Sequence, residues 1–281
     1  MRFKVALIQS SAGSDRSENL ARAEALISES ARAGARVVAL PEVFNFVGDA
    51  SLWIRNAETL QGPTISSLSR LAARFNVFLL AGSIMETSDQ PGKIFNTSVF
   101  LGPDGNVLAA YRKMHLFDVT LPDGVVFSEV DHTIPGKDVV SVATPLGRFG
   151  LTICYDLRFP ELYRALMLRG VDFVFVPSAF TAFTGQYHWE VLLRARAIEN
   201  QVFMLAPNQV GRAVTGVEFY GHSMIVDPWG EVLVRGSNAP ELVVAEVDTD
   251  VLQSVRRRIT SLAKVREDLL RGLNNDKSRN D

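Results

Sequence analysis

The first part of the chain alternates short apolar runs with stretches of helical periodicity. Residues 5–8 and 36–40 are almost wholly apolar, which is typical of strands buried on both faces. Between them, residues 17–33 repeat apolar side chains at helical spacing and stop before Gly34, a common helix end. Strand, helix and strand in this order predict a βαβ unit, and therefore a parallel sheet with a right-handed crossover.

The rest of the pattern predicts further helices and several hairpins. Turns rich in glycine and proline separate the later apolar runs, which favours hairpins at those places. The expected elements are a helix over 64–75, a strand over 77–84, hairpins over 94–111 and 139–154, a loop over 115–136, a helix over 160–169, a strand over 173–176, a helix over 189–200, a strand over 202–206 and a C-terminal helix over 248–270.

Two distant segments have similar sequences. Residues 98–108 and 223–233 both predict a strand, a turn with the pattern P-x-G, and a second strand. A chance match of a common hairpin is one explanation. The other is that the chain has two similar halves, each a sheet covered by helices. Two such sheets packed face to face would form an α/β fold, a four-layer αββα sandwich, which we expect as one domain over 1–270 with a polar tail over 271–281.

Composition restricts the kind of protein. Apolar residues make up 47% of the chain, enough for a large core, so disorder is not expected. A net charge of −2 indicates no nucleic-acid or membrane partner, and we see neither a secretory signal nor an apolar run long enough to span a membrane. The single cysteine cannot form an internal disulfide, so we expect a cytoplasmic protein.

That cysteine, Cys154, is a candidate nucleophile. It ends the apolar run 150–154 and precedes the predicted start of a helix. A sharp turn from strand to helix exposes a side chain and directs backbone N–H groups toward it. Because a free thiol has a pKa of about 8.5, it needs a nearby base or cation to react at neutral pH. The alternative is an inert cysteine of the core.

Glu42 and Lys113 could supply that base and cation. Glu42 follows the apolar run 37–40, so it should lie at the carboxyl edge of the sheet, where ligand sites form. Low polarity there would suit it to general-base work. Lys113 follows a predicted strand and could favour the thiolate or stabilise an oxyanion. The alternatives are a helix-capping or surface glutamate and a solvated lysine.

The segments around these three residues resemble one protein family. LPEVF surrounds Glu42, YRKMHLFD surrounds Lys113 and GLTICYDLRFPEL surrounds Cys154. In this order and spacing, over nearly the whole chain, they resemble the nitrilase superfamily of carbon–nitrogen hydrolases. The resemblance implies an αββα sandwich, a Glu–Lys–Cys triad, no metal or organic cofactor, and dimers or larger homo-oligomers. It also implies that Glu129, in the loop after the lysine, helps to position a small-molecule amide substrate.

The resemblance further implies a mechanism. Glu42 would take the proton of Cys154 as the sulfur attacks an amide carbonyl, while Lys113 and the backbone N–H of Tyr155 hold the oxyanion. Glu42 would then protonate the leaving amine and activate a water molecule against the thioester.

Two segments resemble particular branches of the family. Residues 177–199 and 220–230 are similar to the branch that hydrolyses deaminated glutathione. The omega-amidase branch, which acts on 2-oxo acid amides, typically has other residues where this chain has Ser178 and Thr181. The segment 118–124 departs from both branches, which leaves the substrate open. A nitrilase or an N-carbamoyl amidase would use the same triad.

Other residues near the motifs could contact a substrate. Arg158 lies four residues after Cys154 and could bind a carboxylate through two hydrogen bonds; the alternative is a salt bridge to Glu161 or Glu190. Three residues of a predicted loop could form the wall of a pocket, or simply pack within it: Phe180, Thr181 and Phe183.

Histidines offer a competing interpretation. The four in the chain are scattered and lack metal-ligand spacing, so no zinc site is predicted. The sequence also lacks the glycine-rich motifs of nucleotide sites. In a cysteine–histidine enzyme, His115 or His222 would replace Glu42 as the base. A non-catalytic binding protein on the same scaffold is a third possibility, against which the intact triad argues.

Overall fold

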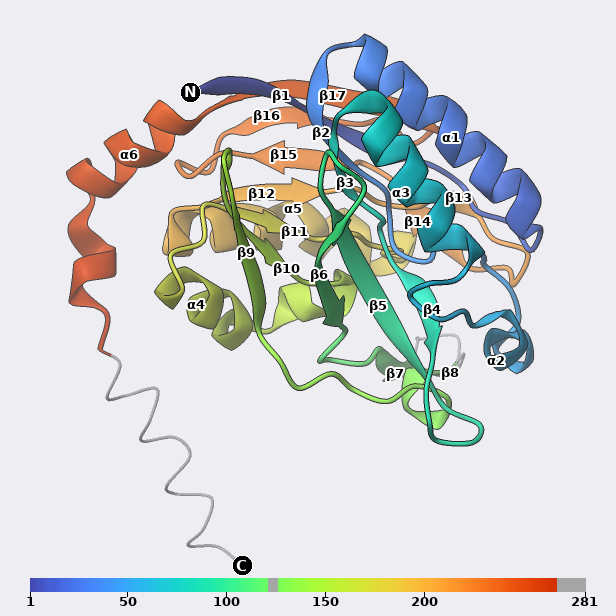
Figure 1. Cartoon of the computed structure of the whole chain (residues 1–281). Coiled ribbons are helices and arrows are strands. Elements are labelled where there is room, and N and C mark those ends of the chain that lie inside the picture. The colour runs from blue at the N-terminus through green and yellow to red at the C-terminus, as the bar shows by residue number, and fades with distance from the viewer. Residues whose placement is uncertain (121–125, 267–281) are drawn as a thin grey trace, which may run out of the picture.

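The structure is a sandwich of two β-sheets with helices on both outer sides (Figure 1). It is a computed structural model and describes residues 1–120 and 126–266. The α/β class and the four-layer αββα arrangement expected from the sequence are confirmed.

The first sheet is parallel at its centre and antiparallel at its edges. Its strands are β1 (Arg2–Gln9), β2 (Ala35–Ala39), β3 (Phe78–Leu80), β4 (Ile84–Thr87), β5 (Ile94–Leu101), β6 (Val107–Arg112) and β17 (Glu241–Asp248). They follow the order β17-β1-β2-β3-β5-β4, with β6 paired to β5. β1, β2 and β3 are parallel, as the βαβ pattern predicts.

Helices cover the outer face of this sheet. α1 (Arg16–Arg32) and α3 (Pro63–Phe75) lie side by side there (Figure 1). Asp15 begins α1 by accepting hydrogen bonds from two backbone N–H groups of the first turn, and a proline occupies the first turn of α3. The short η1 (Ala50–Leu52) and α2 (Trp53–Asn56) lie beside β4.

The second sheet belongs to the later half of the chain. Its strands are β9 (Val140–Thr144), β10 (Gly147–Leu151), β11 (Phe173–Phe175), β12 (Phe203–Ala206), β15 (Met224–Val226) and β16 (Val232–Arg235), in the order β16-β15-β12-β11-β10-β9. The later half also contains η3 (Cys154–Arg158), α4 (Pro160–Leu168), α5 (Ala182–Asn200), β13 (Val210–Arg212), β14 (Glu218–Tyr220), α6 (Thr249–Arg258) and η4 (Thr260–Lys264).

The two similar segments occupy matching places in the two sheets. β5 and β6 form an antiparallel hairpin in the first sheet, and β15 and β16 form one in the second. The predicted hairpin echo therefore corresponds to a structural repeat.

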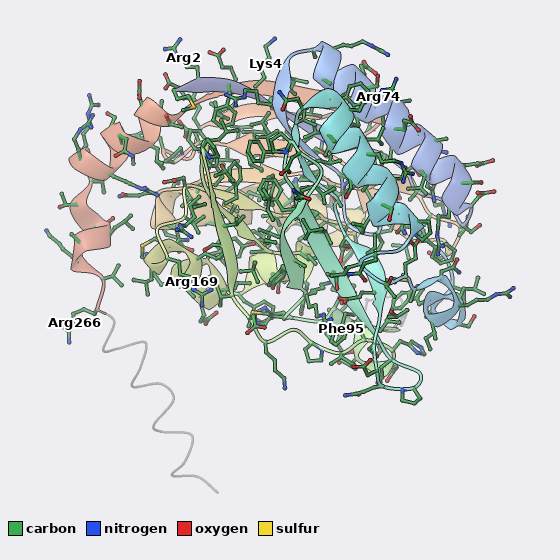
Figure 2. All side chains as sticks on the ribbon, in the orientation of Figure 1. Arg2, Lys4, Arg74, Phe95, Arg169 and Arg266 are labelled. Atoms are coloured by element: carbon green, nitrogen blue, oxygen red, sulfur yellow. The ribbon has the colours of Figure 1, made fainter. Side chains whose placement is uncertain are left out.

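Successive side chains of the central strands point alternately into two different apolar cores. On β1, Val5 and Leu7 belong to the core between the sheets, whereas Ala6 and Ile8 belong to the core under α1 and α3. Both faces are buried, which explains why these strands are continuous apolar runs. Charged side chains lie at the periphery, as Figure 2 shows for Arg2, Lys4 and Arg74.

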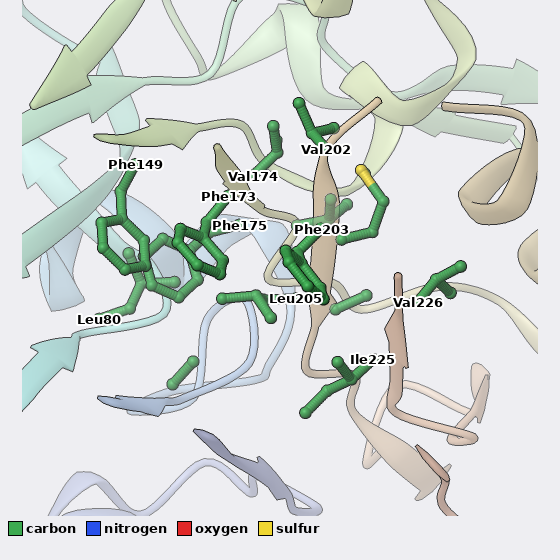
Figure 3. Packing of buried hydrophobic residues seen from close by; sticks show 14 of the residues in the cluster. Leu80, Phe149, Phe173, Val174, Phe175, Val202, Phe203, Leu205, Ile225 and Val226 are labelled. Carbon is green, nitrogen blue, oxygen red and sulfur yellow. The ribbon is translucent and has the colours of Figure 1, made fainter. Parts of the chain in front are cut away.

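Aromatic rings fill the space between the sheets. Phe100 of the first sheet lies 5.3 Å from Phe149 and 5.2 Å from Phe175 of the second, between ring centroids. Phe173 stacks on Phe149 at 4.7 Å and on Phe203 at 5.2 Å. Figure 3 shows the rings of the second sheet side by side. Large rings in tilted and stacked arrangements bury much apolar surface and fix the spacing of the two sheets.

Two predicted elements in the middle of the chain have different bounds. The strand expected over 77–84 ends at Leu80, because Gly82 adopts a φ of +51° and turns the chain before β4. The helix expected over 189–200 begins at Ala182. Gly185 allows this earlier start, since a Cβ there would lie 2.3 Å from the Tyr220 ring. His188 accordingly lies inside the helix.

Two further predictions are corrected. The helix expected over 248–270 stops at Arg258, where Ile259 is extended (φ −114°, ψ 96°) and its carbonyl accepts a hydrogen bond from Gln201. The loop expected over 115–136 contains a small hairpin, β7 (Asp118–Thr120) with β8 (Val126–Ser128), followed by η2 (Glu129–Asp131). The polar tail expected over 271–281 lies outside the described residues.

Within residues 1–120 and 126–266, no helix is long and apolar enough to cross a membrane.

We predict that Phe100→Ala lowers the free energy of unfolding by about 3–5 kcal/mol, because it leaves a cavity between the sheets. Denaturant unfolding followed by tryptophan fluorescence measures the change. Val107→Ala is the control: Val107 is 50% exposed on β6, and its replacement should shift stability by no more than about 0.5 kcal/mol. A similar small shift for Phe100→Ala would contradict this account of the core.

Candidate active site

The three candidate catalytic side chains meet in one place. Glu42 lies in the turn after β2, Lys113 directly after β6, and Cys154 at the turn after β10. The first two come from the first sheet and the third from the second sheet. All three are buried, with 7% exposure or less. Burial excludes the surface-glutamate and solvated-lysine alternatives. Cys154 also belongs to the apolar core cluster, so its role depends on the charged groups beside it.

Lys113 is a buried cation held between two carboxylates. Its Nζ lies 3.0 Å from Glu42 Oε1 and 2.8 Å from Glu129 Oε2. Burial alone would lower the pKa of Lys113, but attraction to Glu129 and Glu42 outweighs it and raises this pKa well above its ordinary value. The ammonium therefore stays charged and positioned at the cluster.

Cys154 occupies a strained turn. Its φ is +44°, a left-handed conformation that costs a non-glycine residue energy. Its backbone N–H donates to the carbonyl of Pro177 at 3.0 Å, and η3 and α4 follow. This is the strand-to-helix turn that the sequence predicts, although Cys154 itself is buried. Burial and the Glu42 carboxylate raise the pKa of the thiol well above its usual value, against the opposing effect of Lys113.

Backbone and side-chain contacts fix Glu42. Its Oε2 accepts a hydrogen bond from the N–H of Ala179 at 2.8 Å, and its Oε1 accepts one from Asn96 at 2.9 Å. Gln209 donates to its backbone carbonyl at 2.9 Å. The next residue, Val43, has a φ of +45°, which is rare for a β-branched residue. The base is thus held in a constrained backbone by both halves of the chain.

Gly82 permits this arrangement. Its φ is +51°, and a Cβ at this position would lie 1.9 Å from the carbonyl oxygen of Pro41. Only glycine lets the two backbones approach so closely. The turn after β3 therefore supports the turn that carries Glu42.

Asp156 connects the lysine segment to the cysteine turn. Its fully buried carboxylate accepts hydrogen bonds from the N–H of Ile153 at 2.8 Å and from the Tyr111 hydroxyl at 2.7 Å. It also contacts the backbone N–H of His115 at 3.1 Å and its Nδ1 at 2.8 Å. One side chain thereby sets the distance between the chain at 111–115 and the chain at 153–156.

A cavity of about 330 Å³ opens onto the cluster. Every predicted site residue borders it except Phe183, which lies on α5 and is half exposed. The bordering residues from the prediction are Glu42, Lys113, Glu129, Cys154, Tyr155, Arg158, Phe180 and Thr181. Phe183 as a wall of the pocket is therefore wrong.

Arg158 does not form either of the salt bridges considered from the sequence. Its guanidinium lies 3.0 Å from His188 Nδ1 and over the rings of Tyr155 and Phe180, 5.6 and 5.1 Å from their centroids. Glu190 pairs instead with Arg194 and Arg235. Among the described residues Arg158 has no carboxylate partner, so its charge is available to a ligand.

Histidines take no part in the lining. Within the described ranges, no histidine borders the cavity and no group of acidic, cysteine or histidine side chains could hold a metal ion. His115 contacts Asp156 and stacks on Phe159 with centroids 3.7 Å apart. The geometry thus favours Glu42 over a histidine as the base for Cys154.

Comparison with known proteins settles the family. A model of the carbon–nitrogen hydrolase family matches residues 4–257. The chain belongs to the carbon–nitrogen hydrolases. It is 42% identical over 263 residues to deaminated glutathione amidase of Synechocystis sp., covering 92% of this chain and 97% of that one. It is 39% identical over 267 residues to human omega-amidase NIT2, covering 95% and 96%.

A solved structure agrees with the family assignment. The crystal structure of Saccharomyces cerevisiae Nit3, a member of branch 10 of the nitrilase superfamily, superposes with a TM-score of 0.84 at 33% identity, covering 92% of this chain and 94% of that one. The protein is thus an enzyme that hydrolyses carbon–nitrogen bonds, and its relatives place it among the amidases.

Sequence analysis missed three features of the hydrolase site. They are the side chains of Asn96 and Asp156 and the backbone N–H of Ala179. Asn96 begins a run of three polar residues, 96–98, within the otherwise apolar β5, and Asp156 follows Cys154 by two residues, so both offered a weak signal. Nothing in the sequence indicates the N–H of Ala179, because its role depends on how the two sheets meet.

We predict that Glu42→Gln lowers the pKa of the Cys154 thiol, because the carboxylate that raises this pKa is neutralised. The midpoint of the pH profile for alkylation by iodoacetamide should then move to lower pH. Mass spectrometry can follow the only cysteine of the hydrolase.

Glu86→Gln is the matched control, since Glu86 is equally buried but pairs with Arg112 away from the thiol. An unchanged midpoint in Glu42→Gln, or a shift to higher pH, would contradict the coupling between the two groups.

Proposed function

We propose that this amidase hydrolyses deaminated glutathione to 2-oxoglutarate and a dipeptide, with Cys154 as nucleophile, Glu42 as base and Lys113 as anion stabiliser. The observation that carries the proposal is one cavity bordered by this triad and by Arg158, which has no carboxylate partner among the described residues. The names of its amidase relatives support the substrate class.

The first half of the reaction forms a thioester. Glu42 accepts the thiol proton as the sulfur of Cys154 bonds to the amide carbon. Charge develops on the carbonyl oxygen, where Lys113 and the N–H of Tyr155 stabilise it. The raised pKa of the thiol is consistent with proton transfer during attack rather than before it. When the C–N bond breaks, Glu42 returns the proton to the nitrogen and the amine leaves.

The second half releases the acid. Glu42 takes a proton from water as the water oxygen bonds to the thioester carbon, and the C–S bond then breaks. The proton returns to the sulfur of Cys154, so the enzyme is regenerated and no cofactor is consumed. Glu129, whose carboxylate bonds Lys113 and the N–H of Phe117, keeps the lysine in place and borders the substrate cavity.

The acyl half of the substrate carries a carboxylate. Arg158 can bind it through two parallel hydrogen bonds. Phe180, whose ring Arg158 contacts, and Thr181 border the same cavity. Deaminated glutathione and 2-oxoglutaramate share this 2-oxo acid end, so an omega-amidase activity is the alternative. A nitrilase or N-carbamoyl amidase would use the triad without the acid end.

We expect Cys154-dependent release of 2-oxoglutarate from deaminated glutathione, and slower release from 2-oxoglutaramate. A coupled 2-oxoglutarate assay with wild type and Cys154→Ala ranks the two substrates by one product. A preference for 2-oxoglutaramate would assign the enzyme to the omega-amidase type. No product from either, with Cys154 still alkylated by iodoacetamide, would refute the substrate proposal and leave the nucleophile in place.

Arg158→Gln tests the acyl half in the same assay. It removes the charge that binds the carboxylate, so KM should rise at least about tenfold, in line with a charged hydrogen bond of about 1.5–3 kcal/mol. Arg164→Gln is the control, since Arg164 on α4 contacts the carbonyl of Glu199 and does not border the cavity.

The setting of the enzyme follows from the same features. The cytosol keeps thiols reduced, which suits an enzyme whose single cysteine is its nucleophile, so we propose a cytoplasmic amidase. We treat residues 1–270 as one catalytic domain, because residues of both sheets belong to one apolar cluster. The formal charge of −2 gives no support to a nucleic-acid partner.

We also propose a homodimer formed through α5. Tyr187 and Val191 lie one helical turn apart on this helix and are 68% and 66% exposed, and Phe183, one turn earlier, is half exposed. A row of exposed apolar side chains indicates an interaction surface. Trp189 of the same helix is fully buried and so cannot contact a partner. Arg256 of α6 is already paired with Asp172 within the chain.

Val191→Asp should convert the dimer to a monomer at micromolar concentration, because it places a charge in the centre of the apolar row. Analytical ultracentrifugation measures the mass. Val107→Asp, on exposed β6, should leave the mass unchanged. A wild-type protein that sediments as a monomer would refute the dimer.

A further inference from the structure

Two groups of residues that border the substrate cavity differ in character. In one group Arg158 lies against Tyr155 and Phe180. The other group comes from the loop after Glu42, from α2 and from strands β4 and β5. We call this second group the apolar annex and define it by four residues that border the cavity: Phe46, Trp53, Met85 and Ile94. Phe46, Met85 and Ile94 form one apolar cluster, and Trp53 packs against it.

The annex adjoins the side of Glu42 that faces the first sheet. Asn96 donates to Glu42 Oε1, and it is paired with Met85 across β4 and β5. Ile94 precedes Asn96 by two residues and so lies on the same face of β5. The other oxygen, Oε2, accepts from the N–H of Ala179, the residue before Phe180, over whose ring Arg158 lies. A group that receives a proton from Glu42 and extends away from Arg158 therefore enters the annex.

A buried hydrogen-bond acceptor lies beside the annex residues Met85 and Ile94. Asn96 is 5% exposed and borders the cavity, and its Oδ1 has no hydrogen-bond partner among the described residues. The bond from its Nδ2 to Glu42 fixes which end of the amide is the acceptor. A buried acceptor without a partner is unfavourable, and an N–H group of a substrate would satisfy it.

We infer that the annex binds an apolar substituent on the scissile nitrogen, with Asn96 Oδ1 accepting the N–H of that nitrogen. The inference rests on the proposed function, in which Glu42 protonates the leaving amine. It makes the enzyme selective for N-substituted amides over primary amides. In deaminated glutathione this nitrogen belongs to a cysteine residue of the substrate, and the side chain of that residue suits the annex. The amide nitrogen of 2-oxoglutaramate carries only hydrogens.

A set of 2-oxoglutaramates with different nitrogen substituents tests the inference. The set comprises the primary amide, the N-propyl amide and the N-(2-hydroxyethyl) amide, which differs from N-propyl only at its end. All release 2-oxoglutarate, so one assay gives kcat/KM for each. Wild type should prefer N-propyl over N-(2-hydroxyethyl) and over the primary amide by about tenfold or more, the usual discrimination of an apolar pocket.

Variants locate the preference in the annex. Met85→Gln keeps the length of the side chain and makes it polar, so the ratio of N-propyl to N-(2-hydroxyethyl) should fall severalfold. Trp53→Ala is a second variant with less risk to folding, because Trp53 is only half-buried on a short helix. Met167→Gln makes the same chemical change at a buried position of α4 outside the cavity and should keep the wild-type ratio.

A second and a third series carry the same nitrogen substituents on amides of succinic acid and of butyric acid. For these series the release of the amine is measured. If only these turn over, the acyl half of the proposed function is wrong and the nitrogen preference is read from them. Equal kcat/KM for N-propyl and N-(2-hydroxyethyl) in the series that turns over would overturn the inference. So would a preference that Met85→Gln and Trp53→Ala leave unchanged. Absence of turnover in every series would overturn the inference and the proposed function together.

Discussion

The rest of the site depends on the burial of the Lys113 ammonium. A cation removed from water costs several kcal/mol unless carboxylates replace its hydration, and here two do so, at 3.0 and 2.8 Å. Burial and the Glu42 carboxylate raise the pKa of the Cys154 thiol against the opposing effect of Lys113, so the thiol stays protonated at rest. The nucleophile is thus activated at the moment when its proton can move to Glu42.

Holding these charges together determines much of the surrounding architecture. The sheets bring the ends of β2, β6 and β10 to one place, and strained residues on both sides complete the turns, since Val43 and Cys154 both have positive φ. Such strain persists only where packing enforces it. The Phe100, Phe149 and Phe175 rings provide that enforcement by fixing how the sheets face each other.

Much of this could be predicted from the sequence because strand patterns are local. The apolar runs that precede Glu42 and Cys154 place both residues at the edge of a sheet. The family motifs indicate that the two residues belong to one site. Features set by distant contacts could not be found in this way. The C-terminal helix stops early because Gln201 bonds the carbonyl of Ile259, 58 residues away. Likewise, the hydrogen-bond partner of a polar residue such as Asn96 can be identified only once the fold is known.

The split origin of the site has a consequence for biosynthesis. Glu42 and Lys113 come from the first half of the chain, whereas Cys154 and the groups that hold Glu42, the N–H of Ala179 and the side chain of Gln209, come from the second. The ribosome adds the base and the cation before the nucleophile, and the two groups that hold the base are added after all three. A chain that stops before residue 209 therefore lacks part of the site, and amide hydrolysis reports that synthesis has passed this residue.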